Sequence, residues 1–274
     1  MNRRKLIGPF LSGLTLLLAF LMFFPILWMV LTSFKPEQLA LSMPPTFFFT
    51  PVLENYQVAL VESPYLEFLW NTVLITGVST LVALLFGFPA SYAMAFYATK
   101  RTNGSMLWMM STRMLPPAGV IVPLFVIFRD LSWLDTYTGM IVVYAGMNLP
   151  LVVWMLRSFM LDLPYGIIEA ARLDGASLFQ ELTQVILPLL IPGLAATILL
   201  CFIFTWNEFF LAVNLTTRSA SPLSVYMSTF KAAQGDLFVA KMSAAATATV
   251  LPVMIAGWVA QRQLVTGLTM GAVK

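Results

Sequence analysis

The chain has 274 residues, of which 59% are hydrophobic and 10% are charged, and its mean hydropathy is +0.87. Such a composition excludes an ordinary soluble domain. The formal net charge of +3 is small and dispersed, which excludes a nucleic-acid-binding face. Histidine is absent, which excludes Ser/His/Asp and Cys/His nucleophilic machinery and a His-ligated metal site. The single cysteine, Cys201, lies in an apolar block, so no disulfide framework is expected.

The apolar residues form continuous blocks of about 20, the length that an α-helix needs to cross roughly 30 Å of hydrocarbon. Continuous blocks, unlike alternating ones, exclude a transmembrane β-barrel. We therefore expect an all-α polytopic membrane protein with a single transmembrane domain over residues 1–274. Six spans are expected, at about 7–32, 71–97, 106–128, 137–160, 188–213 and 242–260.

The N-terminus carries three basic residues, Arg3, Arg4 and Lys5, directly before the first apolar block. A signal peptide is rejected, because the apolar run is too long for an h-region and no small-residue cleavage site follows it. The block is instead expected to be the first span, with its basic end in the cytoplasm. Residues 33–70, punctuated by prolines and acids, are expected to form a periplasmic loop with short interfacial pieces.

The distribution of lysine and arginine predicts the orientation. An even number of spans places both termini on one side of the membrane. Nine of the 15 Lys and Arg residues fall on that side, five fall on the other, and Arg113 lies within a span. This moderate bias predicts that both termini, the segment 161–187 and the tail 261–274 are cytoplasmic.

The segment 161–187 is unusually polar for this chain. Asp162 and Pro164 favour a helix start, so residues 167–173 are expected to form a short helix that ends with a turn at Gly175. Ser177 and Gln180 form a capping-box pattern that opens a second helix. By 3.6-residue periodicity, the apolar face of that second helix is expected to consist of Leu178, Leu182, Val185 and Ile186.

Two interpretations of this segment are open. It could be an amphipathic connector on the bilayer surface, or a docking element for a soluble partner. Interfacial helices usually carry Lys and Arg on the polar face, whereas here Glu169, Asp174 and Glu181 outnumber Arg172. Small residues at 170, 171, 175 and 176 also permit close approach by another protein, which favours docking.

The pattern Glu169-Ala170-Ala171, Gly175, Leu187 and Pro188 stands at fixed spacing, with Val185 where an Ile is usual. It resembles the EAA loop of ABC-transporter permeases. The whole chain resembles the six-span, maltose-type permeases of carbohydrate importers, through Asn71-Thr-Val, Ala90-Ser-Tyr-Ala93, Arg113-Met-Leu-Pro-Pro117, Asn148-Leu-Pro150, Trp206-Asn207-Glu208 and Gly267–Lys274. Within that family, the stretch Trp108–Arg113 and the C-terminal end are most similar to sorbitol and mannitol permeases.

The resemblance implies a type I ABC importer permease fold with a cytoplasmic coupling helix that fits a cleft on an ATPase. It assigns an ATPase-coupling role to Glu169, Ala170, Ala171, Arg172, Asp174 and Gly175. It assigns an anchoring role for the loop to Ser177, Leu187 and Pro188. In such relatives the C-terminal tail, here Gln261–Lys274, also reaches the ATPase.

The implied partners are a second permease subunit in a heterodimer, a cytoplasmic ABC ATPase dimer, a periplasmic substrate-binding protein and membrane lipid. ATP and Mg²⁺ would be bound by the ATPase, because this chain has no G-x-x-x-x-G-K-[ST] phosphate loop. No catalytic residue, cofactor or metal is expected in this chain. The implied location is the bacterial inner membrane, and the implied substrate is a polyol, with a disaccharide such as maltose or trehalose as the alternative.

Polar residues within spans are expensive and suggest function. Glu208 with Asn207 is expected either to offer hydrogen bonds to hydroxyl-rich solutes along a translocation pathway, or to snorkel or pair at an interface. Arg113 could line the pathway or form an internal ion pair that fixes helix packing. Asn148 has the same ambiguity.

Two other classes of protein were weighed. A self-contained secondary transporter would need inverted repeats and ion-coupling charges, and no convincing internal repeat is found. An intramembrane enzyme is disfavoured by the absence of histidine and of paired acids on one span.

Overall fold

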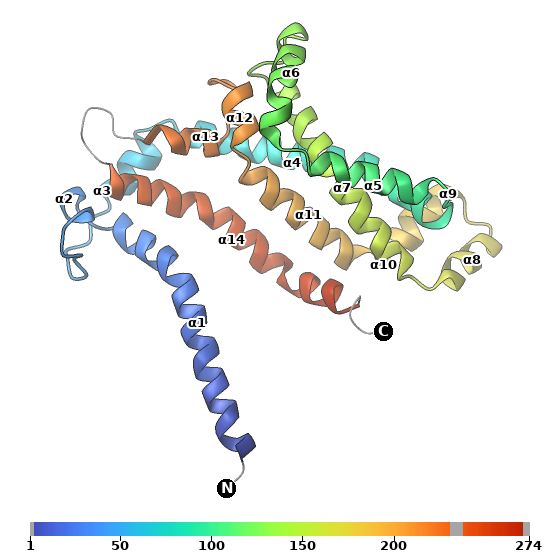
Figure 1. Ribbon diagram of the computed structural model, residues 1–274, viewed down its shortest axis with the longest axis horizontal. Helices are drawn as coiled ribbons and strands as arrows, with labels where there is room; N and C mark the ends of the chain where they lie inside the picture. The colour runs from blue at the N-terminus through green and yellow to red at the C-terminus, as the bar shows by residue number, and fades with distance from the viewer. Residues whose placement is uncertain (1–2, 231–237, 271–274) are drawn as a thin grey trace. The chain divides into compact units, whose positions relative to one another are not determined.

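The computed structural model describes residues 3–230 and 238–270 (Figure 1). Within these ranges the regular structure is helical and no strand occurs. By length and composition, four helices could each cross a membrane, and two bent helix pairs raise this number to six if each pair is one span. The four long helices are α1 (Arg3–Ser33), α4 (Tyr65–Phe96), α7 (Tyr137–Leu161) and α14 (Val239–Met270).

The first bent pair is α5 (Thr102–Arg113) with α6 (Pro117–Asp130), which meet at 89°. The expected span 106–128 is therefore two helices joined by residues 114–116. Pro116 is extended, with ψ of 126°, and Pro117 opens α6. Because proline has no N–H and disfavours the α conformation in the residue before it, the α5 hydrogen-bond ladder cannot continue through this pair.

The second bent pair is the segment Leu178–Leu189 with α11 (Ile191–Trp206), at 80°. After α11 the chain leaves the helix for three residues before α12 (Phe210–Leu215) begins. The expected span 188–213 is therefore interrupted. In contrast, α14 runs beyond the expected span 242–260 to Met270, so the expected tail begins as helix; residues 271–274 lie outside the described part.

The chain separates into two compact units, where the sequence suggested one domain. The first comprises residues 1–66 and 227–251 and contains α2 (Glu37–Ala40), α3 (Glu54–Tyr56) and a π-helix (Gln57–Val61). Here Asn55 Nδ2 donates to the carbonyls of Ser33 (2.9 Å) and Lys35 (2.8 Å). These bonds fold the expected periplasmic loop back onto the end of α1.

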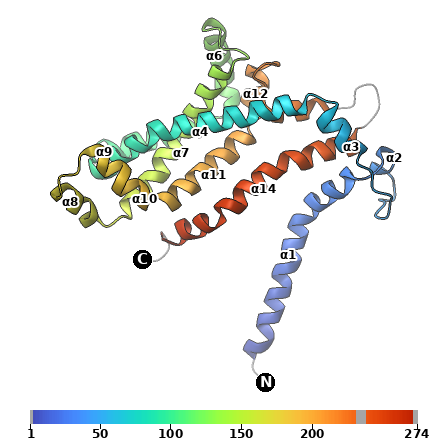
Figure 2. The ribbon, with the colours of Figure 1, turned by 180° about the vertical axis from the view of Figure 1, so that it is seen from behind.

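The second unit comprises residues 67–226 and 252–274. Most of α4 lies beside α7 and α11 in both views (Figures 1 and 2). Glycines permit the close approach, because a Cβ on Gly87 of α4 would meet Val152 of α7, and one on Gly193 of α11 would meet the Phe159 ring. The result is a close-packed core in which Val152, Leu156 and Cys201 have no exposed side-chain surface.

Asp135 ties the turn between α6 and α7 to the segment 216–221 of the second unit. It adopts a positive φ of 53°, and its carboxylate accepts N–H bonds from Thr217 (3.1 Å), Ser219 (3.0 Å) and Ala220 (3.1 Å). Partial burial would raise its pKa, but these bonds outweigh burial and lower the pKa to about 2. The turn is therefore fixed by a carboxylate that stays ionised.

Candidate functional site

The polar segment after α7 forms a helix, a turn and a second helical stretch. Helix α8 (Tyr165–Leu173) follows Pro164 and buries Ile168, which is 1% exposed, against the core. At its end the N–H of Ala176 bonds the Ala171 carbonyl (3.0 Å), and the N–H of Gly175 bonds the Arg172 carbonyl (3.1 Å). With a φ of +82° at Gly175, this is a Schellman motif. The predicted turn at Gly175 is confirmed.

The predicted capping box is also confirmed. Ser177 Oγ accepts from the N–H of Gln180 (3.4 Å), and Gln180 Oε1 accepts from the N–H of Ser177 (2.8 Å). These reciprocal bonds open α9 (Leu178–Gln180), which continues as a π-helix (Glu181–Ile186) and then α10 (Leu187–Leu189). The expected anchoring residues Ser177, Leu187 and Pro188 therefore stand at the start and near the end of one continuous helical stretch.

The apolar face predicted for this stretch was wrong at its first residue. Leu178 is 57% exposed, whereas Glu181 is only 3% exposed. Because a π-helix bonds residues five apart, it aligns Glu181 with Ile186, which is fully buried, rather than aligning Leu178 with Leu182. The inward position is thus occupied by a carboxylate, and this requires a partner.

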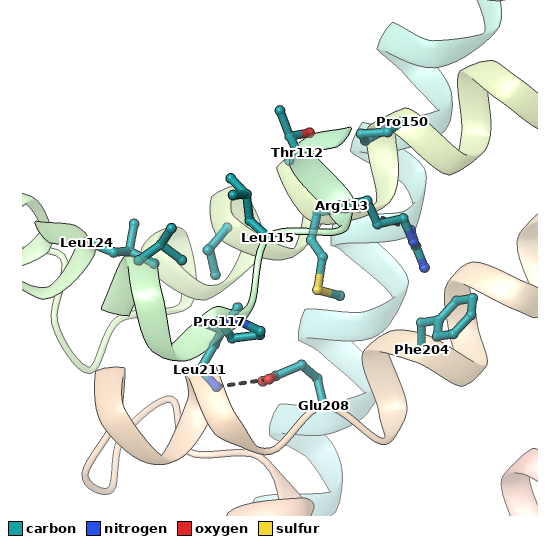
Figure 3. Close-up of a pocket in the computed structure, with 13 residues that line it drawn as sticks. Thr112, Arg113, Leu115, Pro117, Leu124, Pro150, Phe204, Glu208 and Leu211 are labelled. Atoms are coloured by element: carbon teal, nitrogen blue, oxygen red, sulfur yellow. Dashed lines mark hydrogen bonds between the residues drawn. The ribbon is translucent and has the colours of Figure 1, made fainter. Parts of the chain in front are cut away.

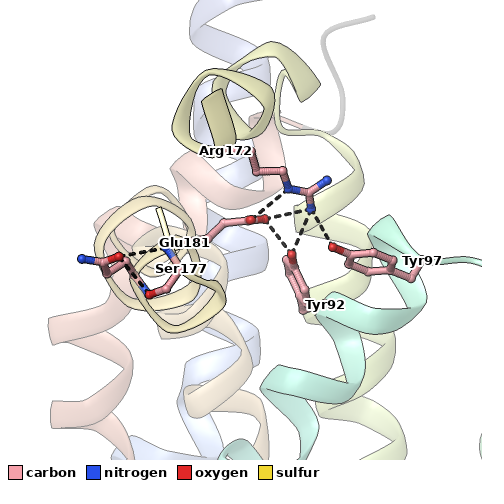
Figure 4. A network of polar contacts seen from close by, with 6 residues as sticks. Tyr92, Tyr97, Arg172, Ser177 and Glu181 are labelled. Atoms are coloured by element: carbon pink, nitrogen blue, oxygen red, sulfur yellow. Dashed lines mark hydrogen bonds and ion pairs between the residues drawn. The ribbon is translucent and has the colours of Figure 1, made fainter. Parts of the chain in front are cut away.

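That partner is Arg172, at the end of α8 (Figure 4). Its Nε donates to Glu181 Oε2 at 3.0 Å, and one of its terminal nitrogens donates to Glu181 Oε1 at 3.1 Å. Tyr92, near the end of α4, donates its hydroxyl proton to the same carboxylate at 2.7 Å. Arg172 also donates to the hydroxyls of Tyr92 (3.0 Å) and Tyr97 (3.2 Å). We call these four residues the arginine network.

The arginine network shifts the pKa of both charged groups. Burial would raise the pKa of the Glu181 carboxyl, but the bonds from Arg172 and Tyr92 outweigh burial and hold the pKa below its usual value. The bonds to Glu181 and Tyr92 raise the pKa of the Arg172 guanidinium above its ordinary value. The resemblance assigns Arg172 to ATPase coupling. In the structure its charge is used in an ion pair within the chain, and its bond to Tyr92 joins α8 to α4.

The remaining residues of the segment leave a mixed exposed surface. Glu169, Ala170, Asp174 and Gly175 are exposed, and Ala171 is half-buried. Beside them, three large apolar side chains are strongly exposed: Leu173 (88%), Leu178 (57%) and Phe179 (73%). Exposed apolar groups next to acids and small residues are typical of a protein-binding surface.

A second candidate site is a cavity of about 470 Å³ in the second unit (Figure 3). It is lined by Thr112, Arg113, Leu115, Pro117, Val120, Leu124, Val143, Gly146, Met147, Pro150, Phe204, Glu208 and Leu211. Its walls come from α5, α6, α7, α11 and α12 and from the breaks after α5 and α11. Both breaks within the expected spans therefore contribute to one hollow.

Arg113 and Glu208 border this cavity in different ways. The Arg113 guanidinium lies 4.5 Å from the Phe204 ring and donates one bond to the Met147 carbonyl (3.2 Å). It forms no ion pair within the described residues. Glu208 accepts from the N–H of Leu211 (2.8 Å), from the N–H of Ala212 (3.1 Å) and from the Tyr144 hydroxyl (2.7 Å). Its carboxylate thus caps the start of α12.

The other two candidate pathway residues do not line the cavity. Asn148 has no exposed surface and donates from Nδ2 to Thr205 Oγ1 (2.7 Å), which joins α7 to α11. Asn207 is exposed and donates to the Ile203 carbonyl (2.8 Å) at the end of α11.

Sequence reasoning missed several residues of both sites. The tyrosines of the arginine network lie 75 to 89 positions from their partners, and no local pattern marks such pairs. Phe204 and Gly146 carry no signal that separates them from ordinary core residues. Pro150 belongs to the Asn148-Leu-Pro150 motif, and its missing N–H was the one available sign that a carbonyl is freed nearby.

The fold is that of the membrane-spanning permease of a type I ABC importer. A similar fold is found in the crystal structure of a bacterial ABC transporter involved in the import of the acidic polysaccharide alginate. The two chains superpose with a TM-score of 0.80 at 24% identity, over 96% of this chain and 99% of the other.

The family is shown by sequence. This chain belongs to the binding-protein-dependent transport system inner membrane components, whose family model matches residues 87–268. It is 33% identical to the trehalose/maltose transport system permease protein MalG of Thermococcus litoralis, over 94% of each chain. It is 32% identical to the diacetylchitobiose uptake system permease protein DasC of Streptomyces coelicolor, over 99% of each chain. The chain is therefore an inner-membrane transport subunit rather than an enzyme.

Proposed function

We propose that this chain is one of two permease subunits of an ATP-driven importer for a polyol or a related neutral sugar. A periplasmic binding protein delivers the solute, and a cytoplasmic ABC ATPase dimer binds ATP and Mg²⁺ and supplies the work. Both chain termini, the segment 161–187 and the C-terminal tail face the cytoplasm. The second permease subunit pairs with this chain in the membrane.

The coupling role rests on one observation: the inner face of helix α8 is bound to the core, whereas its outer face is exposed to solvent. The arginine network and Ile168 fix its inner face to the core. Its outer face presents Glu169 and Leu173 to solvent without a partner element. A lever between an ATPase and membrane helices needs both properties, because a force applied outside must reach the helices inside.

The choice of solute rests on relatives. Two relatives, 33% and 32% identical to this chain, are named for trehalose and maltose and for diacetylchitobiose, which are neutral saccharides, while a third, 32% identical, is named for sulfoquinovosyl glycerol. The similarity of Trp108–Arg113 and Gly267–Lys274 to polyol permeases favours sorbitol or mannitol, with a disaccharide as the alternative.

The coupling role is tested in proteoliposomes that hold this chain with its second permease subunit and its ATPase, with the binding protein added. Glu169→Lys and Leu173→Asp each place a mismatched charge on the exposed outer face of α8. We expect each to reduce binding-protein-stimulated ATP hydrolysis at least about tenfold, the effect of losing an interface hot spot. Glu54→Lys, at an exposed acid of the expected periplasmic loop, is the matched control and is expected to leave stimulated ATP hydrolysis unchanged.

Normal uptake with both docking substitutions would contradict the coupling role. Uptake by this chain alone, driven by an ion gradient and without an ATPase, would instead establish a secondary transporter. The solute is tested by the binding of sorbitol, mannitol, maltose and trehalose to the cognate periplasmic protein. Tight binding of a disaccharide alone would reject the polyol assignment.

A further inference from the structure

The cavity between α5, α6, α7 and α11 has the size of a small-molecule site. Its volume of about 470 Å³ falls within the roughly 300–1,000 Å³ typical of ligand pockets. At ~30 Å³ per water molecule, it has room for about 15 waters. A hexitol or a monosaccharide therefore fits with water left over. Its walls are mostly apolar, with a few polar groups, as such sites usually are.

The first polar group of the cavity is the guanidinium of Arg113. It has five N–H donors, of which one bonds the Met147 carbonyl. The other donors have no partner among the described residues. Phe204 covers one face of the guanidinium and so fixes its plane. An arginine held in this way by a single carbonyl presents oriented donors to whatever enters the cavity.

The second polar group is a backbone carbonyl. Pro150 has no N–H to donate to the carbonyl of Gly146, four residues earlier in α7. Gly146 lines the cavity, and no heavy atom lies within 4 Å of the place that a Cβ would take there. The acceptor that Pro150 leaves without a helix donor therefore belongs to an exposed residue of the cavity wall.

The third polar group is the carboxylate of Glu208. A carboxylate has about four lone-pair sites, and Glu208 uses three of them for Leu211, Ala212 and Tyr144. One site remains for a ligand. Arg113 and Glu208 are the only charged residues among those that line the cavity, so their formal charges cancel. Such a lining favours a neutral solute with both donors and acceptors over an anion, whose charge Glu208 would oppose.

We propose that this cavity is a binding site for a neutral, hydroxyl-rich solute, which accepts hydrogen bonds from Arg113 and donates them to the Gly146 carbonyl and Glu208. The proposal rests on the proposed function in taking the transported solute as the occupant. It gives this chain a share in solute recognition, in addition to its role in coupling.

The test uses thiol labelling in the assembled transporter. The native Cys201 has no exposed surface, so the background is low. Val120→Cys places a thiol on the cavity wall, and Ser105→Cys places one on an exposed part of α5 outside the cavity. We expect mannitol to slow labelling at Val120→Cys severalfold and to leave labelling at Ser105→Cys unchanged. We expect glucuronate, a sugar acid, to protect much more weakly.

The role of Arg113 is tested by Arg113→Gln in the Val120→Cys background. We expect the half-protecting concentration of mannitol to rise ~10-fold or more, the factor that a hydrogen bond to a charged group contributes. Arg157→Gln is the matched control, because Arg157 also donates to a helix carbonyl, that of Met94 (3.0 Å), but does not line the cavity. Should Arg113→Gln fail to assemble, Arg113→Lys keeps the charge, loses the planar fork, and is expected to weaken protection as well.

Absence of protection by mannitol, equal protection by glucuronate, or unchanged protection in the Arg113 variants would each overturn the proposal. The same preparations are assayed for ATP hydrolysis. Lost stimulation in the Glu169→Lys variant together with unprotected Val120→Cys would reject the cavity site and leave the coupling role standing. Mannitol protection together with normal stimulation in the Glu169→Lys variant would reject the coupling role and leave the cavity site standing.

Discussion

The arginine network predicts that its two charged partners are not equivalent. Arg172→Met would leave the Glu181 carboxylate, 3% exposed, with only the Tyr92 hydroxyl. Removing one partner of a buried ion pair costs ~3–5 kcal/mol. Glu181→Gln would leave Arg172, whose side chain is 32% exposed and reaches water. That change removes net hydrogen bonds only, at a cost of ~1 kcal/mol. Arg172→Met is therefore expected to be the more damaging by about 3 kcal/mol, or roughly 150-fold in an equilibrium constant.

The assay follows the docking of α8 on the core. Ile168→Cys places a thiol where the side chain is 1% exposed, so labelling requires that α8 leave the core. In this background we expect Arg172→Met to accelerate labelling by roughly 150-fold or more, and Glu181→Gln to accelerate it less than tenfold. The double variant Arg172→Met/Glu181→Met is expected to label near the starting rate, because apolar residues often replace a buried ion pair without loss.

The pH dependence gives a second, independent prediction. The pKa of Glu181 is lowered in the folded chain, so its contribution to stability is present above its unfolded pKa, ~4.3. That contribution is lost only as pH falls through the lowered value. Labelling, expressed relative to that of the exposed Ser105→Cys thiol at the same pH, should therefore be constant between pH 5 and 8. Without Arg172, burial raises the pKa of Glu181 instead. Acid then restores docking, and labelling of the Arg172→Met variant, relative to the exposed Ser105→Cys thiol at the same pH, should be slower at pH 5 than at pH 8. Equal labelling of Arg172→Met and Glu181→Gln, or no acid rescue, would refute this reasoning.

Three further predictions test local devices. Gly175 has a φ of +82° and no neighbour within 4 Å. Gly175→Val is expected to destabilise the turn by ~1–2 kcal/mol and to lower stimulated ATP hydrolysis. Gly175→Asn is expected to retain stimulated ATP hydrolysis, because Asn tolerates this backbone conformation. Asp135→Asn is expected to lower the melting temperature at pH 7 and to flatten its fall between about pH 4 and 2. The reason is that the pKa of Asp135, about 2, lies below its usual value. An unchanged fall of the melting temperature between about pH 4 and 2 would contradict this. Gly193→Val is expected to cost ~1–3 kcal/mol by collision with Phe159, while Gly77→Ala, in open space on α4, serves as the neutral control in the same thermal unfolding assay.

Local signals predicted local structure well. The Ser177–Gln180 capping box and the turn at Gly175 depend on residues within a few positions, and both are present. The end of α7 at Leu161 lies one residue beyond the expected end, because a polar, proline-containing stretch follows it. The same rule explains the break after α5, which lies at Pro116 and Pro117. In each case the cause and the effect lie within one helical turn.

The features that sequence reasoning could not reach depend on distant partners. The break between Trp206 and Phe210 contains no proline, and hydropathy reads through it as one span. Glu208 sustains this break by capping α12 and by accepting from Tyr144, which is 64 residues away. Likewise, Glu181 is inside because Arg172 and Tyr92 meet it there. A period of 3.6 cannot anticipate that, since the π-helix that turns Glu181 inward departs from this period.

The two candidate sites are joined by one rigid element. At one end of α11, Leu190 packs in the core cluster that holds Tyr92 and Ile168. At the other end, Phe204 and Glu208 line the cavity. Sixteen residues separate these ends within α11, a rod of about 24 Å at 1.5 Å per residue. Because the Phe159 ring of α7 packs on the α11 backbone at Gly193, the two helices cannot slide past each other at the loop end without repacking. We therefore expect a displacement of α8 to reach the cavity as a tilt of α11 against α7 rather than as local bending.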